Sequence, residues 1–450
     1  MIKNVFQNKN ILSLLTNVSI SAFSLLGFFL LARSLDKENF GAWILFTTAS
    51  GLIEMMRFGL TRTALIRFLA GAEIERRDNI IGSNWLISFV VTAILAALIS
   101  LTYLVFSSFI DHSGYEFFFV WYPLLLIFNL PFNNALAIYE ADQKFGSILI
   151  LRLSTGIPFT TFLLLNLFVF KVDLTTIILV HLGIHLLASI YCIFKKLDGF
   201  QLMLISSRQT VVKFLNFGKF TFGTLLGTSL LKSADVIIIG LSPLGSAAVA
   251  IYSIPLKLIE LMQIPLRSFA STAYPKISKA SIKGVQDEVI KLFYTYSGVT
   301  TLLFIPLGVF CFLFSETFIL VLGGEQYLDS MAPIIIFKIF AVYGILLPLD
   351  RFTGIVLDAI NRPKINFYKV LAMAITNILG DVIAVFVFDS IIMVAVVTII
   401  FTIAGQFLGW YYVSRYLPVN FIDLIAETKS ICTIWVRKNM GSISEHNKGA

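Results

Sequence analysis

The sequence is divided into long apolar stretches, each about as long as a helix that crosses a membrane. Twelve of them, bounded by charges or turn residues, fall at 11–32, 41–60, 81–109, 117–139, 147–170, 174–194, 218–240, 247–270, 291–314, 334–358, 367–388 and 391–414. A bilayer-spanning helix needs about 20 predominantly apolar residues. Because 58% of the 450 residues are hydrophobic and only 13% are charged, the chain cannot be an ordinary soluble domain, in which about a quarter are charged. The sequence therefore predicts an all-α polytopic membrane protein with twelve transmembrane helices.

Basic residues are distributed unevenly between the segments that join these stretches. If the N-terminus is cytoplasmic, 25 of the 34 Lys and Arg residues fall in inside segments and 3 in outside loops. The inside set includes Arg57, near the end of the second stretch, and Lys369, near the start of the eleventh. Membrane proteins retain an excess of Lys and Arg on the cytoplasmic side. Both termini are therefore expected in the cytoplasm.

An internal repeat indicates two halves. The segment Leu52–Met56, LIEMM, recurs as Leu258–Met262, LIELM, at an offset of 206 residues. An even number of spans separates the copies, so they have the same orientation, as in transporters built from parallel repeats. The expected parts are a six-helix lobe over 1–197, a cytoplasmic linker over 198–217, a second six-helix lobe over 218–415, and a cytoplasmic tail over 416–450 with an amphipathic helix at the membrane surface. The alternative is that five matching residues in so apolar a chain are a coincidence.

Three pairs of opposite charge lie inside predicted spans at helical spacing. They are Glu54/Arg57, Lys232/Asp235 and Lys257/Glu260, each separated by three residues, which places both partners on one face of a helix. An ionisable group at the centre of a span costs at least about 2.5 kcal/mol, so it normally faces protein or a water-filled cavity. The pairs are expected either to neutralise themselves inside the helix bundle or to line a polar cavity between the two halves.

Other cations in the spans lack a carboxylate at this spacing. Arg351 follows Pro348 and Asp350, and the proline removes one helical hydrogen bond. Arg holds phosphate oxygens through two parallel hydrogen bonds, which makes Arg351 the strongest candidate ligand for an anionic lipid headgroup. Arg152 and Lys338, near the ends of their helices, are at least as well placed to reach the membrane interface. The candidate substrate-binding cations are Arg351, Arg152, Lys257, Lys338 and Lys232, and the candidate cavity or ion-coupling acids are Glu54, Glu260, Asp235, Asp381 and Asp350.

Asp381 and a histidine pair allow more than one interpretation. Asp381 has Asn377 one turn before it, which suits either proton or sodium coupling or a hydrogen-bonded structural acid. His181 and His185 are four residues apart with no third ligand nearby, so helix packing with a hydrogen bond is expected rather than a metal site. Nucleotide-binding and hydrolase motifs are absent from the sequence, and we expect no cofactor and no catalytic residue.

The predicted hairpin over 32–70 carries a family resemblance. Its sequence reads A-R-x-L-x-x-x-x-F-G-x-W from Ala32 and F-G-L-T-R-T-A-L-I-R-F-L-A from Phe58. This pattern resembles the start of the polysaccharide (O-antigen, Wzx-type) flippases of the multidrug/oligosaccharidyl-lipid/polysaccharide exporter superfamily. Looser matches continue at 235–240, 250–255 and 323–327. The family often has Gly in the elbow where this chain has Asp36.

The resemblance implies a transporter rather than an enzyme. Such a protein flips an undecaprenyl-pyrophosphate-linked oligosaccharide across a bacterial inner membrane by alternating access. The implied partners are that lipid-linked oligosaccharide, membrane lipids and, loosely, the polysaccharide polymerase and chain-length machinery, with no nucleic acid. A cationic cavity suits this substrate because it lowers the cost of carrying a pyrophosphate across about 30 Å of hydrocarbon.

Two other functions are compatible with the sequence. A cation-coupled multidrug exporter of the same superfamily is the nearer alternative, but the cations within the spans disfavour it because a cationic drug prefers an acidic, aromatic pocket. A polysaccharide polymerase is disfavoured by the short outside loops, which leave no room for a catalytic module. Without an ATP site, transport is expected to use an ion gradient, the membrane potential or consumption of the product outside.

The charge asymmetry predicts the topology directly. In a variant without Cys192, Cys311 and Cys432, an impermeant thiol reagent added outside should label a cysteine placed at Glu38, Ser113 or Gly324 and should not label one placed at Asp78, Lys279 or Lys364. The reversed pattern would contradict the twelve-span topology.

Overall fold

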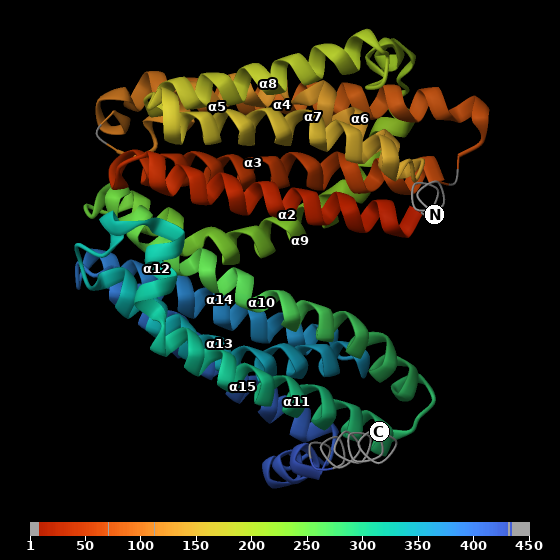
Figure 1. The fold of residues 1–450 in the computed structure, drawn as a ribbon. Coiled ribbons are helices and arrows are strands. Elements are labelled where there is room, and N and C mark those ends of the chain that lie inside the picture. The colour runs from red at the N-terminus through yellow and green to blue at the C-terminus, as the bar shows by residue number, and fades with distance from the viewer. Residues whose placement is uncertain (1–8, 71, 112, 431–432, 434–450) are drawn as a thin grey trace, which may run out of the picture. The chain divides into compact units, whose positions relative to one another are not determined.

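The structure, a computed structural model, describes residues 9–70, 72–111, 113–430 and 433, and these residues form helices and no strand (Figure 1). The chain divides into two compact units, Met1–Ala250 and Ile251–Ala450. The first unit contains α2 (Lys9–Ser34), α3 (Lys37–Ala70), α4 (Ile74–Ile110), α5 (Glu116–Phe128), α6 (Leu130–Ala141), α7 (Phe145–Leu165), the π-helix η1 (Asn166–Phe170), α8 (Leu174–Phe194), the 3-10 helix η2 (Phe200–Ile205) and α9 (Arg208–Leu241). The helix α10 (Gly245–Ile282) begins in the first unit and continues into the second.

The second unit continues with helices of similar length. These are α11 (Gln286–Leu313), the short α12 (Ser315–Gly323), the 3-10 helix η3 (Glu325–Tyr327), α13 (Ala332–Ala359), α14 (Pro363–Phe386) and α15 (Ile391–Tyr416). Residues 421–430 are also helical and leave Ile422 and Ile425 exposed. Most of the predicted tail beyond them lies outside the described residues, so its position on the membrane surface stays a prediction.

Each predicted apolar stretch coincides with a helix or, for the fourth, with the bent pair α5 and α6. Of the helices in the described part of the chain, 9 are long and apolar enough to cross a membrane, or up to 10 if the pair bent by 49° is one span. The predicted spans outside this set are α3 and α9. The all-helical membrane fold is confirmed, whereas the count of twelve spans stays a prediction.

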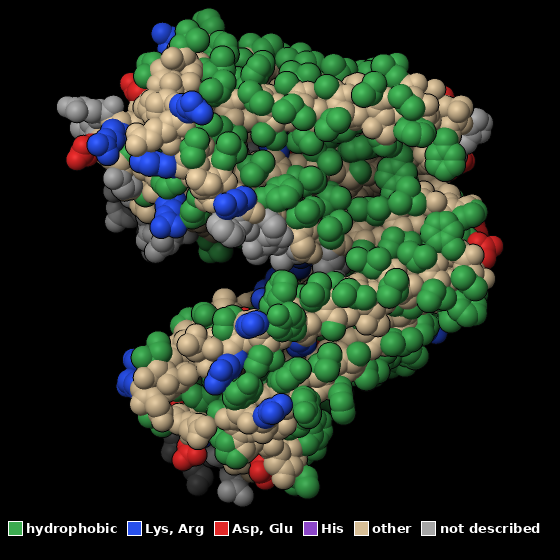
Figure 2. All heavy atoms as spheres, turned by 180° about the vertical axis from the view of Figure 1, so that it is seen from behind, with side chains coloured by type: hydrophobic (Ala, Val, Ile, Leu, Met, Phe, Trp, Pro, Cys, Tyr) green, Lys and Arg blue, Asp and Glu red, His purple; other side chains and the backbone are tan. Residues whose placement is uncertain are grey.

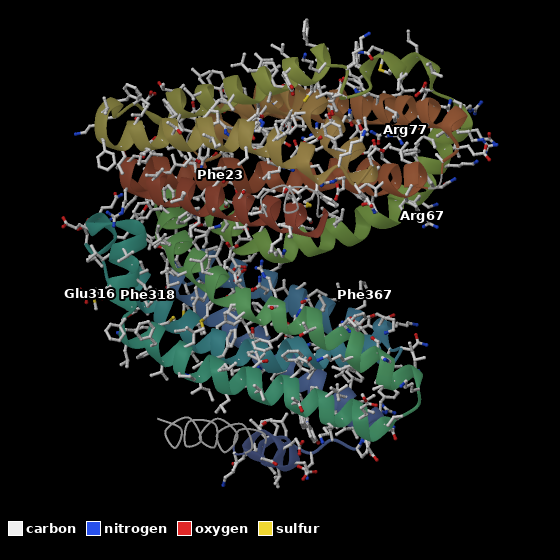
Figure 3. The ribbon with its side chains drawn as sticks, turned by 45° about the vertical axis from the view of Figure 1, so that its right-hand side comes forward. Phe23, Arg67, Arg77, Glu316, Phe318 and Phe367 are labelled. Carbon is white, nitrogen blue, oxygen red and sulfur yellow. The ribbon has the colours of Figure 1, made fainter. Side chains whose placement is uncertain are left out.

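Hydrophobic side chains occupy much of the visible surface of each unit, as expected for a surface in contact with lipid (Figure 2). Arg67 and Arg77 lie toward the same end of the first unit (Figure 3). In the second unit, Glu316 on α12 lies at one end and Phe367 on α14 lies toward the other. The predicted topology requires these two residues on opposite sides of the membrane.

Asp36 forms the elbow between α2 and α3. Its carboxylate accepts hydrogen bonds from the Asn39 backbone N–H at 2.8 Å and from Asn39 Nδ2 at 3.0 Å, so it caps the first turn of α3. Asp and Gly are both favoured at this capping position, which explains Asp36 where the resembled family often has Gly. From this cap α3 continues past the predicted end at residue 60, so the basic segment up to Ala70 is helical.

Ion pairs connect the C-terminal part of α3 and the start of α4 with the end of α6 and the loop that follows it. Arg62 pairs with Glu140 at 2.6 Å, and Asp142 pairs with Arg77 at 2.5 Å and with Lys144 at 3.1 Å. Burial alone would raise the pKa of Asp142, but hydrogen bonds from Arg77 and Lys144 outweigh it and hold that pKa below its ordinary value. The contribution of this cluster to stability is therefore present at neutral pH and is lost as the pH falls through the lowered pKa of Asp142.

The helices α3 and α9 pack closely within the first unit because glycines face the neighbouring backbone. A Cβ added at Gly59 would lie 2.8 Å from Phe222 Cα, and one added at Gly218 would lie 2.5 Å from the Leu60 carbonyl oxygen. Small residues at such crossings let two helices approach closely enough for backbone contact.

This packing predicts the effect of one added methyl group. Gly218→Ala should destabilise the protein by about 1 to 3 kcal/mol, because the contacting atoms belong to the α3 backbone and cannot move cheaply. Gly227→Ala in the same helix is the control, since nothing lies within 4 Å of its added Cβ. Thermal unfolding in detergent should show a lower Tm for Gly218→Ala only; equal Tm values would contradict the close α3–α9 packing.

Candidate anion-binding site

Arg57, one of the cations predicted on the inside, lies buried within α3 in the first unit. Its side chain is 1% exposed and pairs with Glu54 Oε2 at 2.5 Å. It also donates to the Leu126 carbonyl oxygen at 3.0 Å and to Thr92 Oγ1 at 3.2 Å. These bonds connect α3 with α4 and α5, which favours the interpretation that this charge pair neutralises itself inside the bundle.

The other two predicted pairs differ from each other. Lys257 and Glu260 form an ion pair at 3.1 Å, in which the Glu260 side chain is 50% exposed. Among the side chains that the structure describes, Lys232 is exposed and forms no ion pair with Asp235. The predicted Lys232/Asp235 pair is therefore wrong: Asp235 is half-buried, and an ion pair gains the exposed Lys232 only about 0 to 1 kcal/mol.

Arg152 and Lys338 each lie over an aromatic ring. The Arg152 guanidinium is 5.9 Å from the centre of the Phe132 ring, and Lys338 Nζ is 5.4 Å from the centre of the Phe312 ring. Cation–π contacts of this kind stabilise a cation without a carboxylate. Lys338 precedes Arg351 by three to four turns of α13, roughly 20 Å along the helix. The predicted cations therefore do not gather at one place.

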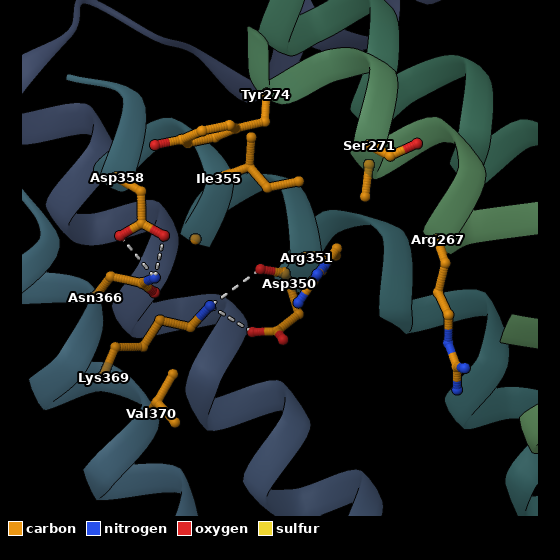
Figure 4. A pocket seen from close by; sticks show the side chains of 12 residues that line it. Arg267, Ser271, Tyr274, Asp350, Arg351, Ile355, Asp358, Asn366, Lys369 and Val370 are labelled. Carbon is orange, nitrogen blue, oxygen red and sulfur yellow. Dashed lines mark hydrogen bonds and ion pairs between the residues drawn. The ribbon is translucent and has the colours of Figure 1, made fainter. Parts of the chain in front are cut away.

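A pocket of about 370 Å³ lies in the second unit between α10, α13 and α14 (Figure 4). Its polar lining residues are Arg267, Ser271 and Tyr274 from α10, Asp350, Arg351 and Asp358 from α13, and Asn366 and Lys369 from α14. Of the site residues predicted from the sequence, Arg351 and Asp350 line this pocket. Arg152, Lys232, Lys257, Lys338, Glu54, Glu260, Asp235 and Asp381 are not among its lining residues.

Lys369, one of the cations predicted on the inside, holds Asp350 at the wall of this pocket. The residue is 3% exposed, and its Nζ lies 2.6 Å from Asp350 Oδ1. Nζ also donates to the Asp350 carbonyl oxygen at 3.0 Å and to Thr353 Oγ1 at 3.2 Å. Gly409 of α15 leaves room for Thr353, because an added Cβ there would lie 2.9 Å from Thr353 Cβ.

A periodic signal in the sequence could have identified Lys369 as a buried residue. Lys369, Met373, Asn377 and Asp381 are spaced by four residues and lie on the buried face of α14. Because this spacing returns to the same side of a helix, Lys369 belongs to the face that carries Asp381. Asp381 itself is fully buried outside the pocket, and its role in ion coupling stays a prediction.

The second acid of the pocket, Asp358, also has its own partner. Asn366 Nδ2 lies 3.0 Å from each of the two Asp358 carboxylate oxygens. Figure 4 shows Asn366 directed at Asp358 and Lys369 directed at Asp350, both from α14. Sequence reasoning missed both Asp358 and Asn366, because they lie near the ends of their helices, where a polar residue is unremarkable.

Two arginines face the pocket without a protein partner for their donors. Arg267 and Arg351 are exposed there and, within the described part of the chain, neither has a hydrogen bond or an ion pair. Arg267 was missed, although it also lacks a carboxylate three or four residues away, the criterion that identifies Arg351. With both acids already engaged, the guanidinium groups can bind an oxyanion such as a phosphate through paired hydrogen bonds.

The histidine pair lies in the first unit, and its predicted packing is confirmed. The ring centres of His181 and His185 are 4.6 Å apart. His181 packs against Trp43 and Phe159, and His185 Nδ1 lies 3.1 Å from Asn129 Oδ1. Asn129 separates α5 from α6, so this hydrogen bond supports the bend between them.

Comparison with known proteins identifies a family match over residues 8–281, to the model described as "Polysaccharide biosynthesis protein". This match includes the hairpin over 32–70 and confirms the resemblance found in the sequence. The probable low-salt glycan biosynthesis flippase Agl15 of Haloferax volcanii is 23% identical over 206 residues, 46% of this chain and 43% of that protein. The alignment thus spans less than half the length of this curated relative.

Solved structures share the fold at low sequence identity. The lipid II flippase MurJ in an inward closed conformation matches with a TM-score of 0.69 and 16% identity, over 94% of this chain and 92% of that chain. An inward-facing multidrug resistance MATE family transporter of the MOP superfamily matches with a TM-score of 0.67 and 14% identity, over 87% and 94%. These similarities establish the fold.

The burial of Arg57 predicts an asymmetry between two ion pairs of equal spacing. Arg57→Met should lower the yield of folded protein, because removing one partner of a buried pair costs about 3 to 5 kcal/mol. Lys257→Met is the matched control, because its partner Glu260 is 50% exposed and stays solvated. Size-exclusion yield and Tm in detergent measure both effects; an equal loss in the two variants would contradict the structural role assigned to Arg57.

Proposed function

Since the chain belongs to the polysaccharide biosynthesis protein family and has the fold of the MOP superfamily exporters, we propose that it flips an undecaprenyl-pyrophosphate-linked oligosaccharide by alternating access. The oligosaccharide is the O-antigen or another surface polysaccharide repeat unit, and the membrane is a bacterial inner membrane with both chain termini in the cytoplasm. The proposal assigns the pocket in the second unit to the pyrophosphate.

The observation that carries this proposal is the pair of unbonded arginines. A pyrophosphate presents several charged oxygens, and two guanidinium groups offer fork-shaped sets of donors that match them. Arg267 and Arg351 come from different helices, α10 and α13, and face the same pocket. Because neither has a hydrogen bond or ion pair among the described residues, binding an anion requires no protein ion pair to be broken.

The position of the pocket suits capture from the cytoplasmic leaflet. Its lining residues lie toward the ends of α10 and α13 and the start of α14, which the predicted topology places on the inside. Next to the pocket, α14 exposes the apolar side chains Phe367 at 61%, Val370 at 39% and Leu371 at 42%. The isoprenoid tail would remain in the bilayer beside this surface while the headgroup enters the pocket.

The same pocket argues against the alternative of a cation-coupled drug exporter. A cationic drug needs an available carboxylate or aromatic cage. Here the carboxylates of Asp350 and Asp358 are bonded to Lys369 and Asn366, whereas the unbonded charges are positive. Transport of the anionic substrate would be driven by an ion gradient, the membrane potential or consumption of the product outside.

Replacing Arg351 tests the proposal. Arg351→Ala should give near-normal levels of folded protein, because it leaves no carboxylate unpaired, and should abolish flipping of the lipid-linked oligosaccharide in proteoliposomes. Arg351→Lys should retain part of the activity, because it keeps the charge but loses the bidentate geometry. Lys338→Ala in the same helix is the control, since Lys338 is not among the residues that line the pocket. Normal flipping by a well-folded Arg351→Ala protein would remove Arg351 from the site.

A further inference from the structure

Both acids of the pocket are on α13, and both of their partners are on α14. Lys369 holds Asp350 with an ion pair of 2.6 Å, and Asn366 holds both oxygens of Asp358 at 3.0 Å. In one pair the α14 partner is a charged amine, and in the other it is a neutral amide. Both acids of the pocket are therefore bonded, whereas its two arginines are not.

The amine of Lys369 and the amide nitrogen of Asn366 both lie against acceptors on α13. A Lys ammonium has three N–H donors, and Lys369 Nζ has three acceptors within 3.2 Å: Asp350 Oδ1, the Asp350 carbonyl oxygen and Thr353 Oγ1. Asn366 Nδ2 lies 3.0 Å from each of the two Asp358 carboxylate oxygens, which share one of its N–H donors. Lys369 is 3% exposed, so its charge is directed at Asp350 rather than at the open part of the pocket.

The acids would otherwise compete for the arginines. Asp350 is the neighbour of Arg351 in the chain, and the charges of Arg351 and Lys369 both act on Asp358. A carboxylate without its own partner in a partly desolvated pocket would pair with the nearest guanidinium and would repel a phosphate. Arg351 stays available only while both acids are held elsewhere.

We infer that Lys369 and Asn366 are positioning residues that determine the anion specificity of the pocket by keeping Asp350 and Asp358 away from Arg351 and Arg267. This inference rests on the proposed function, because it requires the arginines to bind the phosphate groups. It assigns to Lys369 no direct contact with the substrate, although Lys369 is a buried cation at the wall of a pocket for anions.

The test is a double substitution that removes the holding residue and the acid together. The full-length protein is reconstituted in nanodiscs, and binding of undecaprenyl pyrophosphate is measured, with undecaprenol as the probe that lacks phosphate. Lys369→Met should weaken binding of undecaprenyl pyrophosphate by about tenfold to a hundredfold per folded protein, the value of one or two charge-assisted hydrogen bonds. Lys369→Met combined with Asp350→Asn should restore the affinity to within about threefold of the unmodified protein.

The Asn366–Asp358 pair allows the same binding test without removing a cation from the pocket. Asn366→Leu should weaken binding in the same direction, and Asn366→Leu combined with Asp358→Asn should restore it. A purely structural role would move Tm in the single variants and leave the affinity of the folded fraction unchanged. If Lys369→Met does not fold, the double variant still decides, because it contains no unpaired acid.

Two results would overturn the inference. If the Lys369→Met/Asp350→Asn protein folds but binds as weakly as an Arg351→Ala protein, Lys369 is itself a ligand. If the single variants fold and bind normally, the acids do not compete. Failure of the proposed function is distinguishable, because the Arg351→Ala and Arg267→Ala proteins would then bind undecaprenyl pyrophosphate as well as the unmodified protein.

Discussion

The buried contact between Lys369 and Asp350 is the interaction on which the candidate site depends. A lysine that is 3% exposed in a membrane helix requires an anionic partner and further acceptors, and Asp350 and Thr353 provide them. Because the contact uses the carboxylate next to Arg351, the guanidinium faces the pocket without an ion pair. Arg351 is therefore available to a ligand because the buried Lys369 holds the neighbouring acid.

The two units use intramembrane arginines in opposite ways. Arg57 in the first unit is enclosed and bonded to Glu54, to Leu126 and to Thr92, so its charge joins three helices. Arg351 in the second unit is exposed to a pocket, and its adjacent acid is bonded to another residue. The residue type is the same, and the partners decide whether the arginine stabilises the bundle or remains available to a ligand.

The helices could be predicted from the sequence because hydropathy over about 20 residues is a strong, local signal. The burial of Arg57 and Lys369 within α3 and α14 is harder to predict, because a cation near the end of an apolar stretch can equally face the cytoplasm. Arg351 and Asp350 could be identified from local spacing. Lys369 and Asn366 could not be connected to their acids, because the bonds join α14 to α13 and depend on which helices are neighbours.

The central claim is that the pocket between α10, α13 and α14 receives the pyrophosphate of a lipid-linked substrate. The most direct measurement is an experimental structure of the full-length protein in nanodiscs with bound undecaprenyl pyrophosphate. Density for the two phosphates is expected between Arg267 and Arg351, with Lys369 still bonded to Asp350. Phosphate density elsewhere, with this pocket containing only solvent, would contradict the central claim.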